Sequence, residues 1–463
     1  MTRAYALSVP GMAELSIINP ATGAVFAQVP DLTVEQVDET VEAAALAFGT
    51  WRQDEEYRRA CLRACADAVE AAAGELAPLL TAEQGKPLSE ARRELTGTTA
   101  WLRYYADVEP EPEELPSRLP GRATLQRRPL GVIAAIAPNN FPVLIAMAKV
   151  APALRVGNTV VLKPSPYTPV TTARVGELLS DVLPAGVLRV VTGGDQVGRR
   201  MTGHSLVRGI SFTGSTEVGR AIAGVAAGDL KRLTLELGGN DPLIVLDDVE
   251  PAGVAEEIFW RAFNNNGQAC VAPKRIFVPE ARRSAFVDAF AALASSARVG
   301  AGDAPDVQLG PVNNAAQRDR VAELVADARA HGATIVTGGE QPSGDGYFYP
   351  PTIVTDIDPG DRLVVEEQFG PVMPVIGYRS VDDAVGWANA GRWGLGSSVW
   401  GADEKRAIAV ADRIDAGASW VNTHTALSPA FPIAGMKWSG LGAEGGLRGL
   451  DGYTAFQTRY VAS

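Results

Sequence analysis

Residues 132–163, VIAAIAPNNFPVLIAMAKVAPALRVGNTVVLK, decide the fold class of this chain. The stretch begins with a short apolar run, Val132–Ala137, and ends with a second one, Thr159–Lys163; each has the length of a buried strand. The residues between the two runs have a helical pattern. Because a strand that is followed by a helix and another strand pairs with it in parallel, this stretch predicts one unit of a parallel α/β sheet.

The same alternation continues towards the C-terminus. Helices of about 8 to 15 residues separate further predicted strands at Leu188–Thr192, Gly209–Thr213 and Leu233–Leu237. This order predicts a doubly wound sheet, which binds its ligands at the carboxyl ends of its strands. A second α/β stretch runs from about residue 243 to residue 420, with predicted strands at Arg275–Val278, Ile353–Val354 and Ser397–Trp400.

The N-terminal third of the chain is predicted to be mostly helical. Thr33 and Gln36 form a capping box ahead of an amphipathic run that continues to Trp51. A second helical run covers Asp54–Leu80, and a third ends at Tyr105.

The proline-rich segment Glu109–Pro116 cannot be a helix or a central strand, so an exposed connection is predicted there. At the C-terminus, Tyr453–Val461 alternates enough to be a terminal strand.

The composition excludes several classes of function. Of the 463 residues, 46% are hydrophobic and 21% are charged, which is typical of a globular protein with two or more domains. The net charge of -12 argues against nucleic acid or an anionic membrane as the main partner. The longest apolar stretch, Val132–Pro138, is too short to span a bilayer, and no charged segment precedes an apolar run at the N-terminus.

The number and spacing of the cysteines and histidines limit the kinds of site that the chain can form. Three cysteines in a chain of this length indicate a reducing compartment, so a cytoplasmic location is expected. The histidines at 204, 331 and 424 have no metal-ligand spacing, and neither a metal site nor a zinc enzyme is expected. A Ser-His-Asp hydrolase stays open, although no Gly-x-Ser-x-Gly motif occurs.

Cys270 is the cysteine that could carry chemistry. Free cysteine is usually a small buried apolar residue, and Cys61 and Cys65, one helical turn apart in an Ala-rich segment, fit that role. Cys270 instead lies in the polar stretch 263–271, FNNNGQACV, where hydrogen-bond donors can reach a thiol. A thiolate is a strong nucleophile, so Cys270 is a candidate for covalent catalysis.

A candidate phosphate site follows the strand that ends at Thr213. Gly214 lets the backbone approach a ligand closely, and Ser215 opens a helix whose N–H groups suit an anion. A plain turn with a serine cap is the alternative. Lys163, with Ser165 beside it, ends another strand of the same sheet and suits a ribose hydroxyl or a phosphate; a solvated lysine is the alternative there.

Three further segments place polar groups where chemistry needs them. Glu236 ends an apolar strand and is a candidate general base, because burial raises the pKa of a carboxylate. Asn140 could donate its amide to an oxyanion or merely cap a helix before Pro142. Glu367 and Phe369 could bind a ribose and face a planar cofactor, or could form an ordinary surface turn.

Taken together, these segments resemble the aldehyde dehydrogenase superfamily, and the resemblance covers nearly the whole chain. Glu236 and Cys270 are separated by 34 residues, as in the family. The motifs that carry the resemblance are LELGG at 235–239, GQAC at 267–270 and EQFGP at 367–371, between NPATG at 19–23 and KWSG at 437–440.

The resemblance implies oxidation of an aldehyde to the carboxylic acid with NAD(P)+. Cys270 would attack the aldehyde carbon, while Asn140 and the backbone N–H of Cys270 would stabilise the oxyanion. The thiohemiacetal would lose hydride to the nicotinamide, and Glu236 would activate the water that hydrolyses the thioester. Glu444 matches a second acidic residue that is assigned to proton relay in some members.

The resemblance also assigns the cofactor contacts. Lys163, with Ser165, would hold the adenosine ribose, and Glu367 would hold the nicotinamide ribose. Gly214 and Ser215 would face the pyrophosphate, while Phe369 would pack near the nicotinamide. NAD is the expected cofactor; NADP stays possible, because Pro166 replaces the glutamate that binds the ribose 2′-hydroxyl in many NAD-preferring members.

Other departures from the family pattern concern the substrate tunnel, which Phe141 would line. Ala148 replaces the arginine that is typical of members acting on succinic semialdehyde, which argues against a small ω-carboxylate substrate. Asn264 replaces an aromatic residue, and Ile433 replaces a phenylalanine, so a wider and partly polar tunnel is expected. Asn139 replaces a tryptophan beside Asn140, which should loosen packing near the cofactor.

The family's architecture implies three parts. A Rossmann-like, doubly wound dinucleotide-binding domain would comprise residues 1–106 and 130–237, and an α/β catalytic domain residues 238–437. Residues 107–129 and 450–463 would form a small β oligomerisation arm that joins a homodimer or a homotetramer.

The alternatives differ in chemistry. A coenzyme-A-acylating aldehyde dehydrogenase has the same fold, but such members tend to lack the base at Glu236. A non-catalytic structural relative is disfavoured by the intact Cys270, Glu236 and Asn140. A cysteine hydrolase is the third alternative, and the partner in the leading hypothesis is a small-molecule aldehyde.

Overall fold

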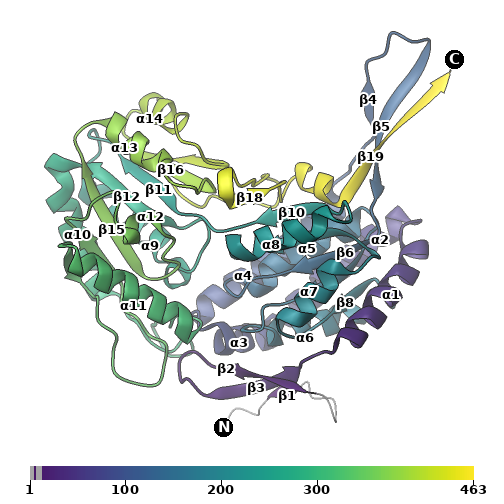
Figure 1. The fold of residues 1–463 in the computed structure, drawn as a ribbon, viewed down its shortest axis with the longest axis horizontal. Helices are drawn as coiled ribbons and strands as arrows, with labels where there is room; N and C mark the ends of the chain where they lie inside the picture. The colour runs from purple at the N-terminus through teal and green to yellow at the C-terminus, as the bar shows by residue number, and fades with distance from the viewer. Residues whose placement is uncertain (1–4, 7–12, 463) are drawn as a thin grey trace.

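The computed structural model describes residues 5–6 and 13–462. Two α/β lobes lie side by side, and a narrow β-ribbon projects from one of them (Figure 1). A small N-terminal sheet lies below the lobe that carries the ribbon; its strands, in spatial order, are β1 (Tyr5–Ala6), β3 (Val25–Pro30) and β2 (Glu14–Ile18).

The sheet of the first lobe has six strands, and all neighbouring pairs are parallel except the outermost one, which β18 adds antiparallel to β10. The parallel order confirms the predicted doubly wound α/β sheet. In spatial order its strands are β18 (Gly440–Leu441), β10 (Arg232–Glu236), β9 (Val207–Thr213), β6 (Val132–Ile136), β7 (Thr159–Lys163) and β8 (Leu188–Val190).

Helices cover both faces of this sheet, because alternate side chains of each strand point to opposite faces. Ile133 and Ala135 of β6 pack in one core with α2 (Glu55–Ala71), α3 (Ala73–Gln84), α4 (Leu88–Asp107), α5 (Pro142–Arg155) and α6 (Val170–Ser180). Val132 and Ala134 pack in a second core with α1 (Val34–Trp51), α7 (Asp195–Gly203) and α8 (Thr216–Ala227).

The second lobe contains a seven-stranded sheet that is parallel except for β13, which pairs antiparallel with β14. Its strands, in spatial order, are β13 (Thr334–Thr337), β14 (Thr352–Thr355), β15 (Val372–Tyr378), β12 (Pro273–Pro279), β11 (Asp241–Val245), β16 (Gly396–Trp400) and β17 (Ala418–Val421).

The helices of the second lobe divide in the same way between the faces of its sheet. One core includes α9 (Pro251–Ala262) and α10 (Arg283–Ser296). The other includes α11 (Ala315–Ala330), α12 (Arg362–Val365), α13 (Val381–Asn389) and α14 (Glu404–Ala411). Short 3₁₀ turns occupy Asn264–Gly267, Glu280–Arg282, Lys437–Ser439 and Arg448–Tyr453.

The projecting ribbon is a three-stranded antiparallel sheet (Figure 1). Its central strand is β5 (Gly121–Pro129), which pairs along its whole length with β19 (Thr454–Ala462) and, over a shorter stretch, with β4 (Glu113–Leu115). The predicted terminal strand is therefore confirmed, and the exposed segment 109–116 contains an edge strand, as its prolines allow.

Two sequence-based expectations need correction. The predicted helix Asp54–Leu80 consists of two helices that break at Ala72. Gly74 and Pro78 follow the break; proline lacks the N–H that would bond the carbonyl four residues earlier, so an uninterrupted helix is disfavoured there.

The other correction concerns strands that the pattern did not reveal: the three N-terminal strands and β11, β13, β15, β17 and β18. Pro374 interrupts the apolar run of β15, and proline is unusual inside a strand because it cannot donate to a neighbour. The N-terminal residues 1–4 and 7–12, on which the absence of a secretion signal was argued, lie outside the described residues.

Candidate active site

Four of the predicted site residues lie at one edge of the first sheet. Asn140, Lys163, Gly214 and Glu236 follow or end β6, β7, β9 and β10, which are neighbours in the sheet. These strands are parallel, with Ile136 opposite Lys163 and Thr213 opposite Glu236. Parallel strands bring their carboxyl ends to the same edge, so the four residues meet where such sheets bind ligands.

Cys270 lies on a loop that connects α9 to β12 and faces this edge. The loop turns sharply at Asn265, Asn266 and Gly267, whose φ angles of 50°, 55° and 74° are all left-handed. Asparagine tolerates this region better than most residues, and glycine adopts it freely. A side chain at position 267 would collide with the carbonyl of Gly370, so the loop packs closely against that residue.

A cavity of about 1270 Å³ brings most of the predicted catalytic and substrate residues together. Its walls also include aromatic and aliphatic side chains from α4, α5 and α9. The predicted site residues that line it are Phe141, Ala148, Glu236, Asn264, Cys270, Ile433 and Glu444.

The protein around Cys270 disfavours its charged form. Burial raises the pKa of the thiol to about 12; the nearby ammonium of Lys274 acts in the opposite direction, and the carboxylates of Glu236, Asp241 and Glu367 add to the rise. Although Cys270 is only half-buried and lines the cavity, its surroundings are largely protein. The thiol therefore keeps its proton at neutral pH in the absence of ligands.

Glu236 is a buried carboxylate that points into the same cavity. Its Oε1 atom has no hydrogen-bond partner among the described residues. Burial raises its pKa well above the ordinary value, and the nearby Glu444 raises it further, while Lys149 lowers it. A carboxylate with a raised pKa is a stronger base than an exposed one, which suits proton abstraction.

A polar network that the sequence did not reveal lies beside Glu236. The buried ammonium of Lys149 donates to Glu444 Oε1 at 2.5 Å and to Thr213 Oγ1 at 2.7 Å. Ser211 Oγ donates to Glu444 Oε1 at 3.2 Å and accepts from the Tyr453 hydroxyl at 3.0 Å. Lys149 could have been noticed, because it is the one charged residue in the apolar helix segment 142–154.

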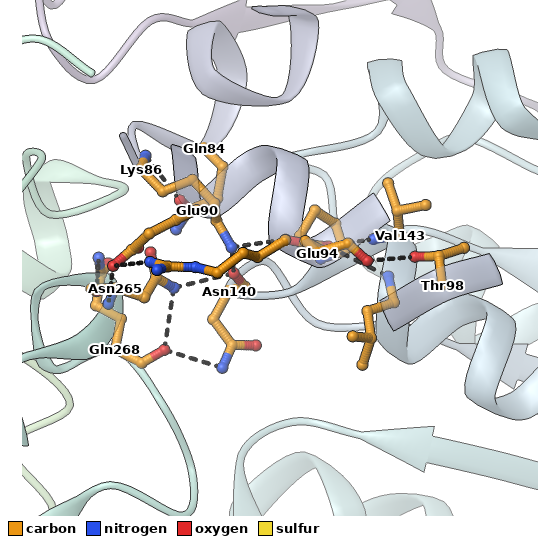
Figure 2. Close-up of polar contacts among 12 residues, drawn as sticks. Gln84, Lys86, Glu90, Glu94, Thr98, Asn140, Val143, Asn265 and Gln268 are labelled. Atoms are coloured by element: carbon orange, nitrogen blue, oxygen red, sulfur yellow. Dashed lines mark hydrogen bonds and ion pairs between the residues drawn. The ribbon is translucent and has the colours of Figure 1, made fainter. Parts of the chain in front are cut away.

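Asn140 is not among the residues that line the cavity; it lies against the loop of Cys270. Its side-chain amide donates to the backbone carbonyl of Gln268 at 3.0 Å, and the Asn265 amide donates to the same carbonyl at 3.3 Å (Figure 2). One N–H of the Asn140 amide thus stays available for another acceptor. Asn139 donates to Asn313 Oδ1 at 2.8 Å, which holds the preceding residue of the turn.

A second cavity of about 280 Å³ brings Ser215 and Glu367 together, with Trp393 and Trp438 in its walls. Glu367 Oε1 accepts from the backbone N–H of Gly239 at 3.2 Å and lies 3.4 Å from the Lys274 ammonium. Phe369 lies two residues further along the same loop.

The backbone of Phe369 has a φ of 47°, an unfavourable conformation for an aromatic residue. Strained backbone of this kind gathers at ligand sites.

Lys163 lies apart from both cavities, next to Ser165, at the carboxyl end of β7. Its side chain is buried, and burial lowers the pKa of its ammonium to about 8. The hydrogen bond that it makes with the described residues goes to the carbonyl of Pro164 at 3.3 Å. The carboxylates of Asp195 and Asp31 partly offset the effect of burial, and the ammonium keeps N–H groups for a ligand oxygen, such as a ribose hydroxyl.

The N-terminus of α8 fits the phosphate groups of a dinucleotide. Ser215 caps this helix and accepts from the N–H of Val218, and Gly214 precedes it. The helix start supplies backbone donors and the positive end of its dipole. These donors and Lys163 make the sheet edge suitable for a dinucleotide.

Two more residues position the loop of Cys270 and were missed from the sequence. Lys274 donates to the carbonyls of Ala269 and Cys270 at 2.8 and 2.7 Å. His424 Nε2 lies 2.9 Å from the carbonyl of Val271. His424 is distant in sequence from the loop, so no local pattern pointed to its role.

Within residues 5–6 and 13–462, His, Cys, Asp and Glu side chains form no group of three or more that could hold a metal ion. In the same part of the chain, every helix is too short or too polar to cross a membrane.

Comparisons with known proteins agree with the resemblance. A model of the aldehyde dehydrogenase family matches residues 9–459. Phenylacetaldehyde dehydrogenase of Pseudomonas fluorescens is 39% identical over 464 residues, which cover 97% of this chain and 92% of that protein. Glutarate-semialdehyde dehydrogenase of Pseudomonas putida is 36% identical, with coverages of 95% and 92%.

Solved structures agree as well. Lactaldehyde dehydrogenase from Escherichia coli has a TM-score of 0.95 at 32% identity, covering 98% of this chain and 97% of that one. An NAD+ complex of an aldehyde dehydrogenase from Bacillus cereus has a TM-score of 0.94 at 33% identity, with coverages of 97% and 93%.

The fold and the comparisons thus define the class of protein, an α/β oxidoreductase. The chain belongs to the aldehyde dehydrogenase family and is an aldehyde dehydrogenase, an enzyme that oxidises aldehydes with NAD(P)+.

Proposed function

We propose that this enzyme oxidises its aldehyde to the carboxylic acid through a thiohemiacetal and then a thioester of Cys270. One observation carries the proposal: Cys270 and Glu236 open on the same cavity, while the amide of Asn140 is bonded to the loop of Cys270. The chemistry needs a nucleophile, a base and an oxyanion donor, and these three residues supply them.

In the first step the Cys270 sulfur adds to the aldehyde carbon. The thiol has to lose its proton as it attacks, because burial keeps its pKa high. Glu236 lies on the same cavity and accepts this proton. The free N–H of the Asn140 amide and the backbone N–H of Cys270 then stabilise the alkoxide.

When bound, the cofactor supplies the acceptor for the hydride that the alkoxide expels as it collapses to the thioester. Lys163 and Ser165 would hold its adenosine ribose, Gly214 and Ser215 its pyrophosphate, and Glu367 its nicotinamide ribose. Phe369 would pack near the nicotinamide end.

In the last step Glu236 takes a proton from the water that hydrolyses the thioester. Glu444 and Lys149 lie beside Glu236 and act on its pKa in opposite directions. Because Glu444 and Lys149 form an ion pair, their opposing effects on the pKa of Glu236 partly cancel. Glu444 also offers a path by which the proton leaves the cavity.

We propose NAD+ as the cofactor and expect NADP+ to be accepted as well. Pro166 follows Lys163 and Ser165 where a carboxylate could repel a 2′-phosphate. Its side chain is exposed and carries no charge, so neither nucleotide is repelled there.

The cavity supports a bulky, mainly apolar aldehyde. Small residues on three helices widen it: Gly97 and Ala100 on α4, Ala148 on α5 and Gly253 on α9. Aromatic rings line the space that these residues leave, namely Trp101, Phe141 and Trp260. Its volume of about 1270 Å³ exceeds what a short aldehyde needs.

We propose that the chain has the three parts expected from the family's architecture, with the same residue bounds. Residues 1–106 and 130–237 would form the dinucleotide-binding domain, and 238–437 the catalytic domain. Residues 107–129 and 450–463 would form the arm that joins a homodimer or a homotetramer.

Replacing Glu236 with glutamine separates the two chemical steps. We expect the first turnover of NADH to slow much less than the steady-state rate, which should fall roughly 100-fold, because solvent can also accept the thiol proton during attack, whereas hydrolysis needs Glu236 to activate its water. Stopped-flow NADH fluorescence measures both rates. A first turnover that is lost together with the steady state would contradict the assignment of Glu236 to hydrolysis.

Two controls complete the test. The Glu83→Gln variant changes a buried carboxylate that caps α6 away from the cavity, and its turnover should stay near the parent rate. Cys270→Ala should bind NAD+ and form no NADH. Strict dependence of the parent enzyme on coenzyme A would overturn the hydrolytic proposal.

A further inference from the structure

A buried ion pair lies behind the turn that carries Asn140 (Figure 2). Lys86 follows the end of α3, and Glu94 lies on α4; their side chains are both 0% exposed, and Lys86 Nζ lies 2.6 Å from Glu94 Oε2. Neither residue lines the substrate cavity. Removing two charges from water costs much of what their attraction returns, so stability alone is a weak reason for such a pair.

The second carboxylate oxygen of Glu94 accepts hydrogen bonds from the first turn of α5. Glu94 Oε1 accepts from the backbone N–H groups of Val143 and Leu144 at 3.0 and 3.2 Å. The first N–H groups of a helix have no partner within the helix, and Phe141, the residue at the cap position, supplies none. A side chain from another helix therefore fixes where α5 begins.

Lys86 holds the two residues that precede α5. Its ammonium donates to the backbone carbonyl of Asn140 at 2.7 Å. It also lies 4.0 Å from the centre of the Phe141 ring, within the range of a cation–π contact. The ion pair thus contacts the turn at Asn140, at Phe141 and at the first turn of α5.

The opposite side of the turn is bonded to the loop of Cys270. Asn265 donates its amide to the carbonyl of Asn140 at 3.0 Å, and Asn140 donates its own amide to the carbonyl of Gln268 at 3.0 Å. The carbonyl of Asn140 thus accepts from Lys86 on one side and from Asn265 on the other (Figure 2).

We propose that Lys86 and Glu94 are positioning residues, which fix the Asn140 amide at the distance from Cys270 that oxyanion stabilisation requires. The inference rests on the role proposed above for Asn140. Losing one oxyanion donor slows related enzymatic steps about 100- to 1000-fold. A displacement of about 1 Å of a catalytic group slows a reaction about 100-fold. A turn that no longer fixes the Asn140 amide should therefore lower the first-turnover rate measurably.

A double-mutant cycle tests the coupling. The first-turnover rate of NADH formation is measured for the parent, Lys86→Met, Asn140→Ala and the double variant. We expect Lys86→Met to slow the parent about 100-fold. In the Asn140→Ala background it should slow the reaction less than about 3-fold, because residues that act through one another are not additive.

Lys231→Met is the matched control. Lys231 is also a buried lysine, with bonds to the carbonyls of His204 and Val207 and to Asp229, but it lies away from the cavities. This variant should lose stability while its first-turnover rate stays near the parent value. If Lys86→Met does not fold, Glu94→Gln replaces it in the cycle, since glutamine keeps the shape and an oxygen for α5.

The possible outcomes separate the inference from the function on which it rests. Equal slowing by Lys86→Met with and without Asn140 would overturn the positioning role and leave the role of Asn140 intact. An Asn140→Ala variant that reacts at the parent rate would overturn the oxyanion role itself. Binding of NAD+, followed by fluorescence titration, should be unchanged in all the folded variants; a parallel loss of binding would assign the pair a purely structural role.

Discussion

The walls of the active-site cavity set the protonation state of Cys270. Burial raises the pKa of the thiol to about 12, and the Lys274 ammonium offsets only part of this effect. The resting enzyme therefore holds a thiol, and its thiolate fraction grows as the pH rises. Deprotonation has to accompany attack, which explains why a carboxylate shares the cavity.

Alkylation of the enzyme by iodoacetamide should report this state. Only the thiolate reacts, so the rate at Cys270 should increase nearly tenfold per pH unit between about pH 7 and pH 10, without a plateau. Quenched time points and mass spectrometry of the labelled peptide measure it. Cys61 and Cys65 are buried and serve as internal controls. A plateau below pH 9 would show that the thiolate forms before any ligand binds.

Single residues also show how far the sequence could predict the site. Cys270 and Glu236 could be named as candidates because their local motifs are distinctive, and the structure places both on one cavity. Lys86, Glu94 and His424 were not, because each acts on a segment that is far away in the sequence. Long-range contacts of this kind leave no local pattern, and only the fold shows them.

At the scale of elements, the loop between α9 and β12 depends on Gly267. Its φ of 74° is costly for other residues, and a Cβ atom there would collide with the carbonyl of Gly370. We expect Gly267→Ala to lower the free energy of unfolding by about 1–3 kcal/mol, the usual cost of such strain. Activity should fall further, because the displaced loop carries Cys270. Urea denaturation and steady-state kinetics measure the two effects.

Gly224→Ala is the matched control, since this glycine lies inside α8 with open space around it. Alanine favours a helix over glycine by about 0.5–1 kcal/mol, so this variant should be slightly more stable than the parent and equally active. A Gly267→Ala variant with parent stability and activity would mean that the loop can relax without cost.

The elements differ in how well the sequence predicted them. Buried parallel strands such as β6 and β7 are continuous apolar runs between turns, and their bounds were predicted within a residue or two. β15 was missed because of Pro374, and the break at Ala72 because the Ala-rich residues before it favour a helix, although Gly74 and Pro78 behind it argue against an uninterrupted one.

At the scale of the whole molecule, the projecting arm buries few of its own side chains. It has three strands, and no helix among residues 5–6 and 13–462 covers either face, so most side chains of β19 are exposed (Figure 1). Phe456 and Tyr460 are 50% and 43% exposed. Because they are four residues apart on a strand, they share one face. An open edge with exposed aromatic side chains is a surface that proteins usually cover.

A second copy of this chain is the cover that we propose, and the double variant Phe456→Asp/Tyr460→Asp tests it. The parent should have a mass of two or four times 48.7 kDa by light scattering, and the variant should have the mass of one chain. Leu230→Asp is the control, because Leu230 is 88% exposed and precedes β10, outside the three strands of the arm. That variant should assemble as the parent does, since charge on an unrelated surface does not affect the interface.

A parent that is monomeric at micromolar concentration would contradict the role of the arm, whereas a monomeric variant with retained first-turnover activity would show that each chain carries a complete active site.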